Sequence, residues 1–179
     1  IVNISNNNVG GITSIGSSVS VTHNIIGILS IGTGVAVTTV NANTIGSAST
    51  PNSLNASTVI TSSTSQYING ISNTGTGTVN ITNNLVANLN NNATNSVAAS
   101  TGSSLRGISV TSGIGTVTGN TIRNMAVASQ GTSTTVHSVI GIYYSATTAG
   151  SHTVSQNTIH SISNSHASAA VYVCGIYYS

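Results

Sequence analysis

The chain has 179 residues, and its only fixed charges are Arg106 and Arg123, because aspartate, glutamate and lysine are absent. Without a basic patch a nucleic-acid-binding protein is excluded, and without carboxylates so are glycoside hydrolysis and calcium sites built from acidic ligands. Hydrophobic residues make up 38% of the chain, mostly Val and Ile at spacings of two and three, which predicts one folded domain of short β-strands rather than a disordered segment.

The first element of the chain is a short apolar pattern arranged around Asn7. Ile4 precedes this asparagine by three residues, Val9 follows it by two and Ile12 by five. A second pattern, Gly followed by Ile, comes at Gly27 in the string IIGILS. β-Branched residues at such spacings are typical of strands, and Asn and Gly are typical of the turns between them.

Both patterns return four more times along the chain. The asparagine pattern recurs as Val40, Asn43 and Ile45; as Ile81, Asn84, Val86 and Leu89; as Val117, Asn120, Ile122 and Met125; and as Val154, Asn157, Ile159 and Ile162. The glycine pattern recurs at Gly70, Gly107, Gly141 and Gly175. Successive asparagines are 36, 41, 36 and 37 residues apart, and successive glycines 43, 37, 34 and 34. Two patterns with one period predict about five repeat units of 34–43 residues.

The repeat varies in length at one place, between the asparagine pattern and the following glycine. There the chain carries stretches rich in Ser, Thr, Asn and Ala, such as residues 47–66 and 90–104. Because insertions are tolerated best in exposed connections, we expect these stretches to be surface loops and the rest of each unit to be scaffold.

A period of this length without a helical pattern predicts an all-β fold. We expect a parallel β-helix (β-solenoid) in which each unit forms one coil of about three strands plus a loop. Two tighter coils of about 18 residues per unit are the alternative. Neither end shows a capping element with a polar outer face, so residues 1–179 are predicted to form a single solenoid segment of a longer repeat array.

The repeated asparagines and glycines have structural roles in this interpretation. Equivalent positions of a parallel solenoid lie about 4.8 Å apart, so amides can form a hydrogen-bonded ladder where identical charges would repel. We therefore expect an asparagine ladder and a column of glycine turns. The ladder consists of Asn7, Asn43, Asn84, Asn120 and Asn157, and the turns contain Gly27, Gly70, Gly107, Gly141 and Gly175.

Four tyrosines of the last two units are the candidates for a ligand site. Tyr143 aligns with Tyr177, and Tyr144 aligns with Tyr178. This alignment predicts two aromatic stacks between coils or, alternatively, a sugar-binding platform. A platform requires that one tyrosine of each pair face the solvent.

No catalytic residue, metal site or cofactor is predicted. Zinc needs three or four convergent ligands, and the five histidines include no HxH or HxxxH pair, so we expect solvated surface residues, with His160 and Arg123 on one outward stripe. Cys174 cannot form a disulfide within the chain and is expected to be a buried or half-buried hydrophobe. A nucleophile formed by Cys174 and a histidine stays open, but it would have no orienting carboxylate.

The strings GNTIRNM, QNTIHSI and the paired GIYYS resemble those of long, secreted, Ser/Thr/Asn/Gly-rich surface proteins of Bacteroidota and related bacteria. The right-handed β-helix repeats of those proteins are similar to the pectate-lyase-like superfamily, and the resemblance covers the whole chain. It implies right-handed coils and an adhesin or passive surface scaffold rather than an enzyme, because the acidic calcium ligands of the lyases have no counterpart in this sequence.

The expected function is therefore non-enzymatic: an extracellular, self-associating stalk, adhesin body or filament subunit at the bacterial cell surface. A carbohydrate-binding surface module, an inactive relative of β-helix polysaccharide lyases and, less favoured, an ice-binding protein are the alternatives. Expected partners are further repeats or copies at both ends, and surface glycans. No apolar run approaches the roughly 18 residues of a membrane-spanning helix, which argues against membrane insertion.

Overall fold

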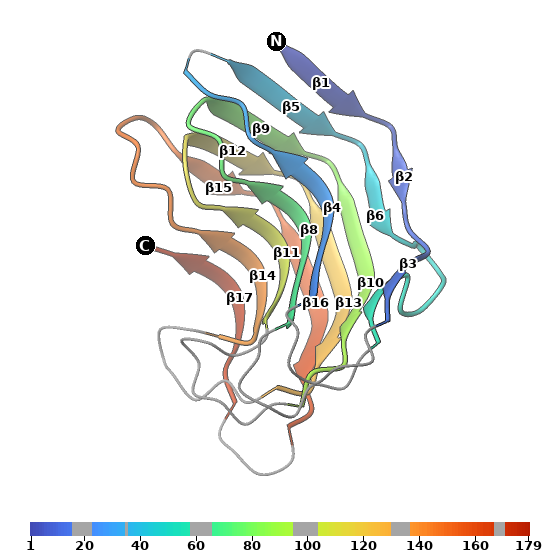
Figure 1. The fold of residues 1–179 in the computed structure, drawn as a ribbon. Helices are drawn as coiled ribbons and strands as arrows, with labels where there is room; N and C mark the ends of the chain where they lie inside the picture. The colour runs from blue at the N-terminus through green and yellow to red at the C-terminus, as the bar shows by residue number, and fades with distance from the viewer. Residues whose placement is uncertain (16–22, 35, 58–65, 95–103, 130–136, 167–170) are drawn as a thin grey trace.

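The computed structural model describes residues 1–15, 23–34, 36–57, 66–94, 104–129, 137–166 and 171–179. Within these residues it contains 17 strands and no helix, and therefore no helix long and apolar enough to cross a membrane. The strands form three parallel sheets that wind around a common core as a β-solenoid (Figure 1).

Each sheet takes one strand, or two short ones in succession, from every level of the solenoid. The first sheet contains β1 (Val2–Ser5), β5 (Val37–Asn41), β9 (Thr78–Thr82), β12 (Ile114–Thr118) and β15 (Thr153–Ser155). The second contains β2 (Asn8–Val9) with β3 (Ile12–Ser14), β6 (Thr44–Gly46) with β7 (Leu54–Ala56), β10 (Leu85–Asn91), β13 (Thr121–Val127) and β16 (Thr158–Asn164). The third contains β4 (His23–Ser30), β8 (Gln66–Asn73), β11 (Ser104–Val110), β14 (Val139–Tyr144) and β17 (Val173–Tyr178).

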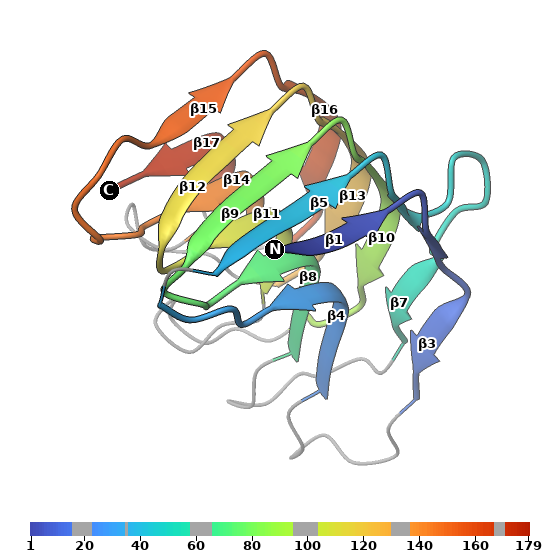
Figure 2. The ribbon, with the colours of Figure 1, turned by 90° about the horizontal axis from the view of Figure 1, so that it is seen from above.

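Each repeat unit forms one coil that visits the three sheets in turn (Figure 2). The next unit then pairs in parallel with the previous one, as β1 does with β5 and β5 with β9. The predicted parallel solenoid with one coil per unit is confirmed, and the alternative of two coils per unit is wrong. The solenoid has about four turns, whereas the sequence analysis predicts about five units.

The core consists of apolar columns that run through the levels. Examples are Val40, Ile81 and Val117 in the first sheet, Ile45, Val86 and Ile122 in the second, and Ile71, Ile108 and Ile142 in the third, all fully buried. Complete burial of a Val or Ile side chain is worth about 1.5–3 kcal/mol. These columns hold neighbouring levels in one register, because a slip by one residue would turn the apolar side chains outward.

The corner between the first and second sheets is made by one residue per level with a positive φ. These residues are Asn6, Ala42, Asn83, Gly119 and Gln156, with φ between 53° and 70°. Each directly precedes a ladder asparagine. Asn and Gly adopt this left-handed conformation readily, whereas Ala42 and Gln156 adopt it at a cost of about 1–2 kcal/mol.

The prediction that residues 47–66 form a surface loop is wrong for part of that stretch. Strand β7 lies within it and pairs with β10, and both Leu54 and Ala56 are fully buried. In the second stretch, Asn90 and Asn91 belong to β10, and Asn91 is buried. Residues 58–65 and 95–103 of the predicted loops lie outside the described residues.

The glycines of the Gly-Ile pairs lie inside strands, so their assignment to turns is wrong. Gly27, Gly70, Gly107, Gly141 and Gly175 lie within β4, β8, β11, β14 and β17. The strand pairing skips each glycine, and these strands are curved (Figure 1). A Cβ on Gly107 would lie 2.6 Å from the carbonyl oxygen of Gly141 and 2.6 Å from Cγ2 of Ile122. Glycine is therefore needed for close approach, to the next level and to the second sheet.

Candidate functional site

The predicted asparagine ladder is confirmed, and it is buried over its middle three levels. Oδ1 of Asn84 accepts hydrogen bonds from the backbone N–H and from Nδ2 of Asn43, both at 2.9 Å. The backbone N–H and Nδ2 of Asn84 donate to Oδ1 of Asn120, also at 2.9 Å, and Nδ2 donates to the Val40 carbonyl. The same bonds join Asn7 to Asn43 and Asn120 to Asn157. Each backbone N–H of the ladder thus donates to the following level, whereas Nδ2 donates both to the following asparagine and to a carbonyl of the preceding level.

The four tyrosines of the last two units form two stacks on opposite sides of the third sheet. Tyr144 is fully buried in the core and stacks on Tyr178, with ring centroids 5.5 Å apart. Tyr143 and Tyr177 are half-buried, and their rings stack at 5.1 Å and 5°. In each adjacent pair, Tyr143–Tyr144 and Tyr177–Tyr178, the first tyrosine therefore lies on the outer face, as a ligand platform requires.

Tyr144 anchors the chain segment that leads into β15. His152 Nε2 lies 2.7 Å from the Thr148 carbonyl and must donate to it, so Nδ1 accepts from the Tyr144 hydroxyl at 2.5 Å. Burial raises the pKa of Tyr144, because the phenolate would be desolvated. Tyr144 and His152 are thus joined as a structural pair, and the prediction that His152 is a solvated surface residue is wrong.

Replacing Tyr144 with Phe is expected to lower the free energy of unfolding by about 1 kcal/mol, the net value of a typical hydrogen bond. The raised pKa means that the folded state favours the neutral phenol. The resulting contribution to the free energy of unfolding is complete below the ordinary tyrosine pKa of 10.0, and it is lost as the pH rises through the pKa of the folded state. Phe cannot ionise, so the free energy of unfolding of the variant should fall less than that of the wild type as the solution is made alkaline. Urea unfolding at neutral and alkaline pH checks this, with Tyr143→Phe as the control; equal losses in both variants would contradict the role of the Tyr144 hydroxyl.

Arg106 lies against the outer tyrosine stack, an arrangement that the sequence analysis did not predict. Its guanidinium carbon is 3.8 Å from the centroid of the Tyr143 ring, a cation–π contact. Since Tyr177 covers the other face of Tyr143, a ligand approaching from outside meets the edge of this ring and not a free face. We call Arg106, Tyr143 and Tyr177 the outer cluster.

The charge of Arg106 is unusual in its surroundings. The side chain is half-buried, and burial lowers its pKa. Its Nε is buried without a hydrogen-bond partner, and Nη1 reaches Ser109 Oγ only at 3.5 Å. The chain contains no carboxylate side chain that could pair with it. Arg123, by contrast, donates to the Ala48 carbonyl at 2.6 Å. Since Nε of Arg106 is buried, the two Nη groups are the donors of the outer cluster that an anionic group could meet.

His137, His160, His166 and Cys174 are the remaining candidates, and the side chain of His23 lies outside the described residues. His160 is exposed beside Arg123 on the neighbouring strand, as predicted. His137 and His166 are half-buried, which corrects their prediction as solvated residues, and the His137 ring contacts Tyr172 and Tyr177. Cys174 is half-buried, and burial raises the pKa of its thiol. Among the residues described, no three His or Cys side chains gather as metal ligands would.

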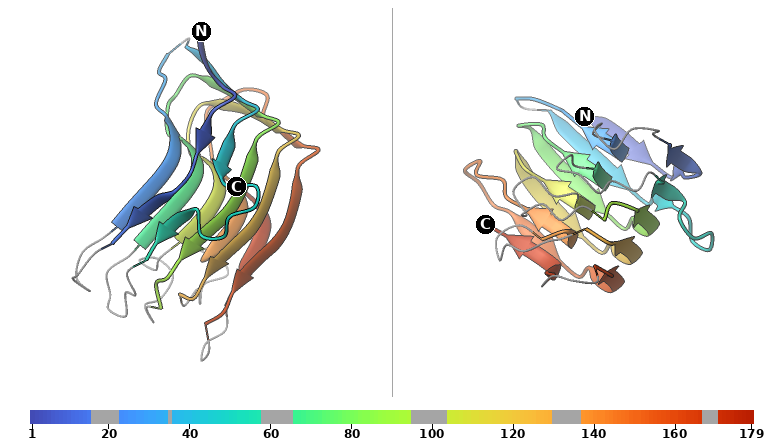
Figure 3. Two further views of the ribbon diagram at one scale, coloured as in Figure 1. Left: turned by 90° about the vertical axis from the view of Figure 1, so that its right-hand side faces the viewer. Right: turned by 60° about the horizontal axis from the view of Figure 1, so that its bottom comes forward.

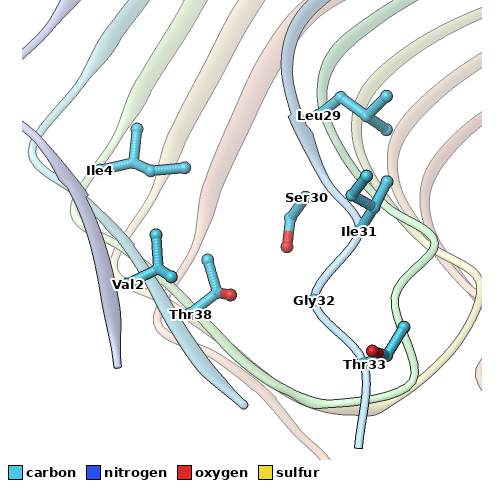
Figure 4. A pocket seen from close by; sticks show the side chains of 8 residues that line it. All are labelled: Val2, Ile4, Leu29, Ser30, Ile31, Gly32, Thr33 and Thr38. Carbon is cyan, nitrogen blue, oxygen red and sulfur yellow. The ribbon is translucent and has the colours of Figure 1, made fainter.

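Both ends of the solenoid are open, and the exposed large apolar side chains of the described residues lie on the first or the last level. They are Ile1, Val2, Ile12, Ile15, Ile26, Leu29 and Ile31 on the first level, and Val173, Ile176 and Tyr178 on the last. The first level also has a hollow between β1 and β4, lined by Val2, Ile4, Ser30 and Ile31 among others (Figure 4). The ends are therefore the second candidate surface.

Comparisons of the chain with protein-family models, with curated proteins and with solved structures find no match.

Proposed function

We propose that this chain is a non-enzymatic, extracellular structural or adhesive solenoid, which acts as a surface stalk, an adhesin body or a filament subunit. The kinship with secreted surface proteins of Bacteroidota that the repeat strings imply is part of this proposal. So is self-association, which the open ends favour.

The observation that supports this role is the continuity of the stack. The same hydrogen-bonded ladder and the same apolar columns join every level to the next, with little change between the first level and the last. A repeated, almost uncharged scaffold of this kind extends in one dimension by adding levels. Such a body separates or connects what is attached to its ends, which is the task of a stalk or filament.

The experiment is immunogold electron microscopy of cells that make the protein, with antibodies against the folded chain. We expect gold particles on the surface of intact cells or on structures that extend from it. Labelling that appears only after the cells are permeabilised would contradict an extracellular role. An antibody against a cytoplasmic protein serves as the control for cell integrity.

A second candidate function, binding of acidic glycans, is favoured by one observation. The half-buried guanidinium of Arg106 has no carboxylate partner in the chain, and its Nη groups make only one long hydrogen bond, to Ser109 Oγ at 3.5 Å. A carboxylate or sulfate group on a sugar could accept from these donors in bidentate geometry.

A glycan array tests this candidate. Wild-type protein should bind acidic glycans and not neutral ones, and Arg106→Gln should weaken the binding about tenfold or more, because a hydrogen bond to a charged group is worth about 1.5–3 kcal/mol. Arg123→Gln removes the other fixed charge of the chain and should leave binding within about twofold, the range of small surface effects. Equal losses in the two variants would indicate non-specific charge attraction.

A further inference from the structure

We propose that the two ends of this solenoid are complementary, and that a second copy of the chain docks head to tail on each end in continuous register. The proposal rests on the structural role above and names the partner of the open ends. In the docked pair, β15, β16 and β17 of one copy would lie beside β1, β2 with β3, and β4 of the next. Figure 3 shows the first and the last level of one chain at opposite ends of the stack.

The asparagine ladder leaves complementary hydrogen-bonding groups at the two ends. At every step within the chain, the backbone N–H and Nδ2 of one level donate to Oδ1 of the following level. Asn157 closes the series, so its backbone N–H faces the C-terminal end without an acceptor on a following level. Asn7 opens the series, so its Oδ1 has no donor from a preceding level. Docking in register would join Asn157 to Asn7 of the next copy as one more step of the ladder.

The apolar columns also match across the junction in all three sheets. Counted through the pairing of the strands, Val154 would lie beside Ile4 in the first sheet. Ile159 would lie beside Val9 in the second. Ile176 would lie beside Ile28 in the third. Each of these columns is apolar at both ends, so docking buries like against like.

The shapes of the two ends correspond at the largest exposed ring. Tyr178 is 62% exposed on the last level and belongs to the same column as Ser30 on the first. Ser30 is small and lines the hollow of the first level (Figure 4). The ring of Tyr178 would therefore come to lie over this hollow, beside Ile31, which is 65% exposed.

Electrostatic repulsion does not oppose the contact. The two arginines lie on β11 and β13, in the interior of the stack, and the chain has no acidic residue or lysine. The two docking surfaces are different from each other, so the contact is heterologous and does not close on itself. Such contacts produce open filaments rather than symmetric dimers.

Sedimentation velocity of the purified chain from low to high micromolar concentration tests the proposal. We expect a ladder of species that grows with concentration, and elongated particles in negative-stain electron microscopy. Tyr178→Asp and Ile31→Lys each place a charge on one end, at positions exposed enough for the fold to tolerate it. Each variant alone should associate at least about tenfold more weakly, whereas an equimolar mixture should recover association because the new charges meet across a head-to-tail junction.

Gly175→Ala provides an independent test with a minimal change. A Cβ on Gly141 would lie 2.5 Å from the carbonyl oxygen of Gly175, the next glycine of the column, whereas a Cβ on Gly175 meets nothing within 4 Å. In the docked pair it would meet Gly27 of the next copy. Gly175→Ala should therefore weaken association and leave the thermal melting of the single chain unchanged.

Ala126→Asp and Ala126→Lys, on the exposed face of an interior level, serve as charge controls and should associate like the wild type. A wild-type chain that stays monomeric over the whole range would overturn the docking proposal. So would a single dimeric species, or a mixture of the two end variants that fails to associate. If the protein is labelled on the cell surface but the purified chain is monomeric, the proposed structural role stands and only the docking proposal is contradicted.

Discussion

Replacing Asn84 with Asp is expected to destabilise the fold by about 3–5 kcal/mol, the cost of breaking a buried polar network and leaving a charge without a partner. The substitution keeps the size of the side chain but removes both N–H donors. The new carboxylate would then face two acceptors, the Val40 carbonyl and Oδ1 of Asn120, that now receive hydrogen bonds from Nδ2. Asn84 is only 2% exposed, so water cannot replace the lost donor.

Urea unfolding at several pH values measures this effect. Protonation returns one donor to the new side chain and removes its charge, so the loss of stability should shrink as the solution is made acidic. Asn8→Asp is the matched control: Asn8 lies on β2, two levels away in the second sheet, and is exposed, and we expect a change within about 0.5 kcal/mol there. If Asn84→Asp unfolds like the control, the ladder contributes little to stability and the repeated asparagines need another explanation.

Replacing Gly107 with Ala is expected to cost about 3 kcal/mol, at the upper end of the range for overpacked cores. The added Cβ would lie 2.6 Å from the Gly141 carbonyl oxygen, which belongs to a paired strand on the next level and cannot move alone. It would also press on Ile122, which is fully buried in the second sheet. The added methyl group would therefore strain two contacts, one with the next level of the third sheet and one with the second sheet.

Gly175 offers an internal control for this prediction, because it holds the same position on the last level but has no atom within 4 Å of an added Cβ. Gly175→Ala should leave the free energy of unfolding of the single chain within about 0.5 kcal/mol of the wild type. Chemical denaturation of both variants, at concentrations where the chain is monomeric, gives the comparison. Equal losses would mean that the glycines matter for their own backbone freedom and not for the space beside them.

The sequence did not predict which tyrosines point into the core and which point outward. Simple alternation along a strand places successive side chains on opposite faces. In β11, however, Leu105 and Ile108 both face the core although they are three positions apart, because the strand bends at Gly107. The parity of the pattern therefore changes at each glycine. Only the bend decides that Tyr144 enters the core while Tyr143 lies outside.

The outer cluster was missed for a related reason. Strand pairing places Arg106 beside Ile140, and its contact with Tyr143 is diagonal to that pairing and depends on where a long side chain leans. Strand β7 was missed because its Ser- and Asn-rich surroundings are typical of loops, and burial of Leu54 follows from pairing with β10, which lies on the next level. Neither the contact of Arg106 with Tyr143 nor the burial of Leu54 can be predicted from a local sequence pattern.

The sequence by itself determined the solenoid, its parallel stacking and the asparagine ladder, because these features repeat, and a repeated residue at a constant period must meet its own copy on the next level. The tertiary structure alone decided where strands bend, which tyrosines are buried, which charge lies against an aromatic ring, and how the two ends correspond. Those features depend on contacts between different parts of neighbouring levels, whose distances are set by the packing of the walls and not by the period of the repeat.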